Sequence, residues 1–302
     1  DSTAMGLFFS SDRFTRPGPG VRPDAPRKKG VARLAEIMGR DMWNFFRAGF
    51  LAFLGCLPFI IGMFFAVETH ALLFMLLAGI IGGLIAGPEL SAMADTVLRS
   101  LRDEPGYWWE TYRRVWKRNA RESLVPGMLT GLVLSMQIFT LFHMSVISAG
   151  IVTWVLLILS FVVTLGLESY IWPQIALLDL PLYGILKNSL LLFLGYLPRS
   201  LGAIAIKAVY WGAILLFFPL TTIILPFTNF WLPMLPALLC IYQPLNKCFT
   251  IESTINKMRE DELNAALAKD NEPLPEDPTE KAEESTEASS DDSSSDVQRS
   301  EE

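Results

Sequence analysis

Residues 43–67 read WNFFRAGFLAFLGCLPFIIGMFFAV, and this stretch decides the fold class because Arg47 is its one charged residue. Its apolar side chains would surround a helix completely, whereas a helix of a soluble protein carries an apolar stripe on one face. Crossing the hydrocarbon core of a bilayer takes roughly 20 predominantly apolar residues. Five further blocks meet this length. We therefore expect an all-α, polytopic membrane bundle of six transmembrane helices, at residues 43–67, 71–93, 124–147, 151–176, 200–225 and 230–251.

The connections between these blocks alternate in charge. The N-terminal segment, residues 94–123 and residues 177–199 carry nearly all of the Lys and Arg, whereas the connections near 68–70, 144–150 and 226–229 carry none. Basic connections stay on the cytoplasmic side of the membrane. This alternation predicts that both termini are cytoplasmic. A seventh apolar stretch, within 185–197, is too short to count as a span and would move the C-terminus outside.

The acidic total describes the C-terminal tail. The formal net charge is −6, but residues 260–302 hold sixteen Asp or Glu and three Lys or Arg. The remaining residues hold 22 basic and 15 acidic side chains, so that region is net +7. We expect a basic cytoplasmic segment at 1–42, a transmembrane domain at 43–251, and an acidic, disordered cytoplasmic tail at 252–302, which has too little apolar surface to fold.

The segment between the second and third spans has the composition of an interfacial amphipathic helix. Over 105–121, aromatic residues share one helical face and basic residues occupy the other. Aromatic rings prefer the headgroup level, and basic side chains are attracted to anionic lipid. The helix either anchors the cytoplasmic side in the bilayer or docks a partner; these interpretations are compatible, and nucleic acid is not an expected partner. The residues concerned are Trp108, Trp109, Tyr112, Arg113, Arg114, Trp116, Lys117, Arg118 and Arg121, and a weaker helix of this kind is expected at 182–197.

Small residues and charges within the spans supply the other candidates. Gly79, Gly83 and Gly87 recur at every fourth position, which favours close helix–helix packing over a flexible gating helix. Charged residues inside spans are costly and invite a functional hypothesis. Glu168 and Lys207 are the candidate intramembrane charges, and we interpret them as a structural pair or solvated anchors in preference to a transport pathway.

No catalytic pattern occurs in the chain. The sequence has no GxSxG, phosphate-binding loop, HExxH or Cys/His cluster, so we expect no enzyme, no cofactor and no metal site. Its three cysteines are too few for a disulfide framework. Its two histidines, His70 and His143, stand apart in the sequence, and a structural or interfacial role is the expectation for both.

Several of these segments resemble one bacterial family. They are MGLF at 5–8, NFFRAGFLAFLGCLP at 44–58, GPELSA at 87–92 and the Arg/Trp segment 99–121. Together they resemble the YesL-like family of integral membrane proteins, a domain of unknown function. Glu89 and the insertion at 16–30, rich in Pro and Arg, depart from the family pattern. The resemblance implies six spans in the cell membrane of a bacterium and an association with carbohydrate ABC transporters, and it supplies no catalytic residues.

Two functions follow as hypotheses. The first is an accessory or regulatory subunit associated with a carbohydrate transport system, which docks through 105–121. The second is a stand-alone transporter or channel for a small solute. The loop typical of ABC permeases is not found in 94–123 or 177–199, which argues against a permease subunit. The oligomeric state stays open.

Overall fold

The computed structural model describes residues 27–104, 106–144, 146 and 150–270, and these residues form helices and no strands. The chain divides into two units, one ending at Phe249 and one beginning at Thr250. The motif at 5–8, most of the insertion at 16–30 and the tail from residue 271 lie outside the described residues. All-α architecture is therefore confirmed for the described part of the chain.

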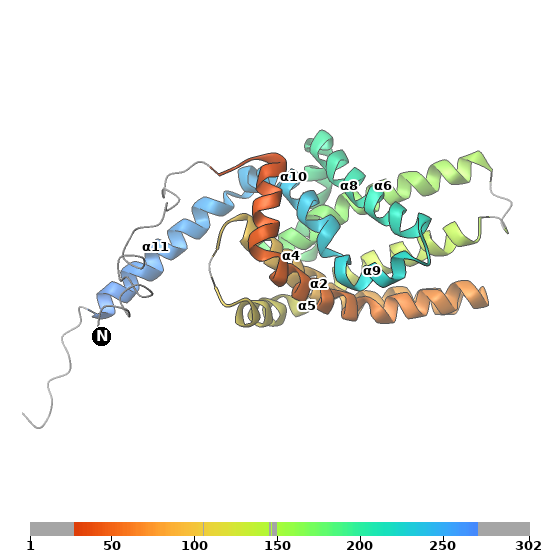
Figure 1. The fold of residues 1–302 in the computed structure, drawn as a ribbon, viewed down its shortest axis with the longest axis horizontal. Coiled ribbons are helices and arrows are strands. Elements are labelled where there is room, and N and C mark those ends of the chain that lie inside the picture. The colour runs from red at the N-terminus through yellow and green to blue at the C-terminus, as the bar shows by residue number, and fades with distance from the viewer. Residues whose placement is uncertain (1–26, 105, 145, 147–149, 271–302) are drawn as a thin grey trace, which may run out of the picture. The chain divides into compact units, whose positions relative to one another are not determined.

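The first unit begins with three long helical segments. Helix α2, Gly30–Thr69, is the first, and the second consists of α3, Leu72–Leu77, a π-helical turn η2, Ala78–Gly82, and α4, Gly83–Leu101. Helix α5, Trp108–Phe142, packs along α4, and α2 packs against both of them. In Figure 1 the red start of α2 is angled to its orange remainder.

The second half of this unit is less regular. It contains α6, Ile151–Leu177, α7, Leu182–Gly195, α8, Leu197–Leu216, α9, Thr221–Thr228, and α10, Trp231–Phe249. The ends of α2 and α5 lie at one end of the unit, and the end of α4 and the start of α5 lie at the other, as Figure 1 shows. These helices thus run up and down, and their orientation across a membrane stays a prediction from the alternating charges.

Five helical segments among the described residues are long and apolar enough to cross a membrane. They are Gly30–Thr69, Leu72–Leu101, Trp108–Phe142, Ile151–Leu177 and Leu197–Leu216. Large apolar side chains on them face outward, such as Phe64 at 62% exposed and Leu159 at 56%. Exposed apolar surface on this scale is unfavourable in water and is what a lipid-facing surface requires.

The sixth predicted span is not among the five. It corresponds to α10, which contains Pro236 and Pro244 and carries Lys247 in its last turn. Its residues Leu235, Ile241 and Leu245 are fully buried, since α10 contacts α2, α4, α6 and α8. A helix enclosed by other helices needs less apolar surface than one that faces lipid. Six spans thus remain a prediction, of which five are supported.

Three predicted boundaries differ from the structure. The segment 105–121 was expected to form a helix separate from the third span, but α5 runs through both without a break. The fifth span was expected to reach residue 225, but α8 ends at Leu216 and a turn at 217–220 precedes α9. The second unit includes helix α11, Ile251–Asp270, in the first part of the segment where we expected a disordered tail.

Candidate functional site

The start of α5 is fixed to α4 through a single carboxylate and contacts α2 through an arginine. The Tyr112 hydroxyl donates to Glu89 Oε2 at 2.5 Å, and the Trp116 indole Nε1–H donates to Glu89 Oε1 at 2.9 Å. On the neighbouring turn, the Arg47 guanidinium of α2 lies 5.7 Å from the Trp108 ring centroid, within the range of a cation–π contact. Glu89 therefore holds two of the predicted interfacial residues in place.

The remaining predicted residues of this helix are mostly exposed. Tyr112 is buried with Val115 and Asn119 on the face of α5 that packs inward. Trp109 is 56% exposed and Trp116 is 37% exposed. Arg118 reaches the end of α6, where its Nη2 donates to the Ala176 carbonyl oxygen at 2.9 Å. The exposed set, which we call the basic–aromatic surface, consists of Trp109, Arg113, Arg114, Trp116 and Lys117, and Arg121 follows it on the next turn.

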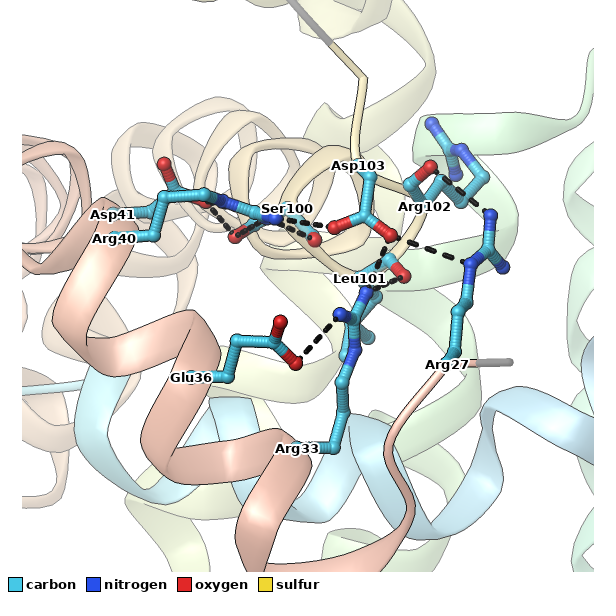
Figure 2. Close-up of polar contacts among 9 residues, drawn as sticks. All are labelled: Arg27, Arg33, Glu36, Arg40, Asp41, Ser100, Leu101, Arg102 and Asp103. Atoms are coloured by element: carbon cyan, nitrogen blue, oxygen red, sulfur yellow. Dashed lines mark hydrogen bonds and ion pairs between the residues drawn. The ribbon is translucent and has the colours of Figure 1, made fainter. Parts of the chain in front are cut away.

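Three arginines close the C-terminal end of α4, as Figure 2 shows. Arg33 Nη2 donates to the Leu101 carbonyl oxygen at 3.1 Å, Arg40 Nη2 donates to that of Ser100 at 2.7 Å, and Arg27 Nη2 donates to that of Arg102 at 3.3 Å. A helix leaves its last carbonyl groups without intrahelical partners, and cations are favourable there. The arginines thereby join the start of α2 to the connection that leads into α5.

Asp103 lies at the centre of this arginine cluster. Arg33 Nη2 donates to its Oδ2 at 2.6 Å, Arg27 Nε lies 3.3 Å from the same atom, and Arg40 pairs with Oδ1. Partial burial alone would raise the pKa of Asp103, but the hydrogen bonds from Arg40 and Arg33 outweigh it and hold that pKa below its usual value. The carboxylate is therefore ionised at neutral pH. No pattern in the sequence pointed to this cluster.

The glycines of the second span form the contact with α5. A Cβ atom at Gly83 would lie against the Gly127 carbonyl group, and one at Gly87 would lie against the Ser123 carbonyl oxygen. A Cβ atom at Gly79 would lie 2.9 Å from the Leu132 Cα atom. The facing positions are also glycines, because a Cβ atom at Gly131 would lie 2.8 Å from the Gly83 Cα atom. The backbones of the two helices touch, as the predicted packing role requires.

Glu168 of α6 and Lys207 of α8 lie in the interior of the bundle. Both line a cavity of about 390 Å³ whose other lining residues come from α2, η2, α4, α5, α9 and α10 as well as from α6 and α8. Lys207 is 8% exposed. The two charges are near enough for Coulombic attraction, yet they form no ion pair within the described part of the chain. The structure thus brings them to one cavity without joining them.

The two histidines, which stand 73 positions apart in the sequence, meet at the end of the unit opposite the arginine cluster. His70 Nδ1 lies 2.7 Å from His143 Nε2, and His143 Nδ1 lies 2.7 Å from the Phe139 carbonyl oxygen. Because a carbonyl accepts, His143 Nδ1 carries a proton, and in the neutral ring Nε2 accepts from His70. The pair joins the end of α2 to the end of α5. Groups of three or more metal-ligating side chains do not occur among the described residues.

Comparisons of the chain with models of protein families, with curated proteins and with solved structures give no match.

Proposed function

We propose that this chain is an accessory or regulatory subunit of a membrane transport system and that it docks through the basic–aromatic surface of α5. One observation carries the proposal. Arg113, Arg114 and Lys117 are exposed, form no ion pair with another described residue, and lie on the same helix as the exposed Trp109 and Trp116. Trp and Arg are the residue types that contribute most to binding energy at protein interfaces.

The support beneath this surface favours a protein partner in addition to lipid. Tyr112 and Trp116 are fixed by Glu89, and the same helix continues to Phe142 within the bundle. A surface on a rigid element loses little conformational entropy when a partner binds, which favours specific docking. Attraction of the basic residues to anionic lipid is compatible with this docking and keeps the surface at the membrane.

The proposed setting is the cell membrane of a bacterium, with six spans and both termini in the cytoplasm. Five apolar helices support a membrane location, and α10 is the proposed sixth span. The orientation rests on the basic connections. The partner proposed from the YesL-like resemblance is a carbohydrate ABC transporter, and the partner patch would be acidic to complement Arg113, Arg114 and Lys117.

Co-purification with a matched control tests the docking proposal. The full chain is extracted in a mild detergent, and integral transporter subunits recovered with it are identified by mass spectrometry. The triple variant R113E/R114E/K117E should lose these subunits. The triple variant K28E/K29E/K187E makes the same change in net charge at exposed positions and should retain them. Recovery of the chain alone in every detergent, or equal loss in both variants, contradicts the proposal.

A stand-alone transporter is the second candidate, and the interior cavity is the observation in its favour. Its test is solute flux into proteoliposomes that contain this chain alone. Uptake of a sugar or ion above that of empty liposomes supports it, and no uptake across a panel of such solutes rules it out for those solutes.

A further inference from the structure

The cavity between the helices has an apolar wall. Its volume of about 390 Å³ falls in the range of small-molecule sites, which are lined mainly by apolar and aromatic side chains with few polar groups. Glu168 and Lys207 are the charged residues among its described lining. The polar group of Thr130 is already used, since its hydroxyl donates to the Pro126 carbonyl oxygen at 2.9 Å. The aromatic part of the wall comprises Phe53, Phe59, Phe161, Trp172, Trp211 and Phe230.

Lys207 is a polar group of the cavity lining that has no hydrogen bond to another described residue. Its side chain is more than nine-tenths buried and makes no hydrogen bond or ion pair with any residue that the structure describes. An ammonium group has three N–H donors. Glu168 and Lys207 also line a cavity of about 10 Å³, which has room for about one water molecule. Such a water would use one of the three donors, which leaves two for a ligand in the larger cavity.

We propose that this cavity binds a single-chain anionic amphiphile, with the acyl chain against the aromatic wall and the carboxylate or phosphate head at Lys207. An apolar tail matches the wall, and an anionic head accepts the hydrogen bonds that Lys207 offers. A sugar does not match, because each of its hydroxyl groups would need a polar partner and the wall offers too few. This inference is independent of the docking proposal.

The buried ammonium group of Lys207 does not stabilise the fold. A buried charge without a direct partner opposes folding, and an apolar residue of similar length at position 207 would remove that cost. Groups that a protein retains at the expense of stability are typical of binding sites. Glu168 attracts the ammonium group but also repels an anion, so its removal should leave the binding of an anionic head intact or strengthen it.

Tryptophan quenching by brominated probes tests the proposal on the full chain in a non-ionic detergent. Trp172 and Trp211 line the cavity, so a bromine atom bound there quenches their fluorescence. The probes are ω-bromoundecanoate, ω-bromoundecanol and ω-bromoundecylammonium, which share a chain length and differ in head group. We expect saturable quenching with the anion bound about tenfold more tightly than the alcohol, the ratio that one charge-assisted hydrogen bond supplies.

Three variants separate the contributions. Lys207→Met should weaken binding of the anion about tenfold and leave binding of the alcohol unchanged. Glu168→Gln should keep the preference for the anion. Leu134→Trp, which fills the cavity, should weaken binding of all three probes. Equal binding of the three probes, or an unchanged anion affinity in Lys207→Met, overturns the proposal. A preference for the cation that Glu168→Gln abolishes also overturns it. The three-probe comparison on the unmodified chain decides the matter if a variant does not fold.

Discussion

The substitution Gly83→Ala is the most direct test of the contact between α4 and α5. The new Cβ atom would lie against the Gly127 carbonyl oxygen, 2.9 Å from the Gly127 carbonyl carbon and 3.1 Å from the Met128 Cα atom. All three are backbone atoms of α5, so no side chain can rotate to make room. The two helices must therefore separate by a few tenths of an ångström or more.

The expected cost follows from two opposing effects. Overpacking of a well-packed contact costs about 1–3 kcal/mol, partly because a gap of 0.5–1 Å forfeits roughly a quarter to a half of the dispersion energy of the atoms that face it. Replacing Gly by Ala within a helix returns about 1 kcal/mol of helix propensity. We therefore expect Gly83→Ala to destabilise the bundle by up to about 2 kcal/mol, and to be about 1–3 kcal/mol less stable than a Gly→Ala variant without the clash.

Gly202→Ala is the matched control. Gly202 lies within α8, and a Cβ atom there would meet no atom within 4 Å. This variant gains the helix propensity without the clash, so it should be more stable by about 0.5–1 kcal/mol. Unfolding of the purified proteins by dodecyl sulfate, followed by helical circular dichroism, ranks the variants.

The double variant Gly83→Ala/Gly127→Ala sharpens the test. Once the first alanine has separated the helices, the second should lower the free energy of unfolding by less than it does alone. The difference is the coupling free energy between the two positions. If Gly83→Ala is as stable as Gly202→Ala, then α4 and α5 do not touch through their backbones and the packing argument is wrong.

Three further predictions concern polar contacts. Glu89→Gln should destabilise the protein by about 1–2 kcal/mol because it weakens two hydrogen bonds to a charged acceptor. The control Glu110→Gln, on the exposed side of α5, should change stability by less than about 0.5 kcal/mol. Chemical unfolding measures both changes. Asp103 has a lowered pKa in the folded state, so its carboxylate stabilises the fold above about pH 4, and this contribution is lost as the pH falls through the folded-state value. Asp103→Asn should thus cost about 1 kcal/mol at neutral pH and reduce the acid dependence of stability, and an acid dependence equal to that of the unmodified chain would contradict this. A double-mutant cycle of His70→Ala and His143→Ala should give a coupling free energy of about 0.5–1.5 kcal/mol, and a coupling of zero would mean that the imidazoles do not share a hydrogen bond.

The sequence predicts the membrane helices well where they face lipid. Span 151–176 matches α6, Ile151–Leu177, nearly residue for residue, because a lipid-facing helix must be apolar all round. Helix α10 illustrates the limit of this rule. Its buried face packs against other helices, so Pro244 is tolerated there and the composition of α10 no longer reports its environment.

The packing role of the glycine row, Gly79, Gly83 and Gly87, was predictable from the sequence, and so were the glycines of the third span that face it. Gly79, Gly83 and Gly87 indicate a packing face by their spacing, and Gly127 and Gly131 in the third span repeat the same spacing. A search for facing small residues would have paired these two spans. The sequence does not state the register between them.

Contacts between distant residues were not predictable from one sequence. Glu89 and Tyr112 are 23 positions apart, and His70 and His143 are 73 apart, so no helical spacing relates the members of either pair. The boundary at residue 124 failed for a different reason. It was placed where charged residues give way to apolar ones, but a helix needs no change of backbone conformation where its surroundings change from headgroups to acyl chains.

The glycines on both sides of the α4–α5 contact also explain why the bundle contains a cavity. Gly83, Gly127 and Gly131 belong both to the α4–α5 contact and to the cavity lining, so part of the wall is backbone without side chains. Larger residues at these positions would push the helices apart and fill the space at once. Stability of the contact and volume of the cavity are therefore coupled at these positions. Leu134→Trp separates the two effects, because it narrows the cavity from a position outside the glycine row. If ligand binding falls in Leu134→Trp while stability is unchanged, the space itself, and not merely the close helix contact, is what the glycine row provides.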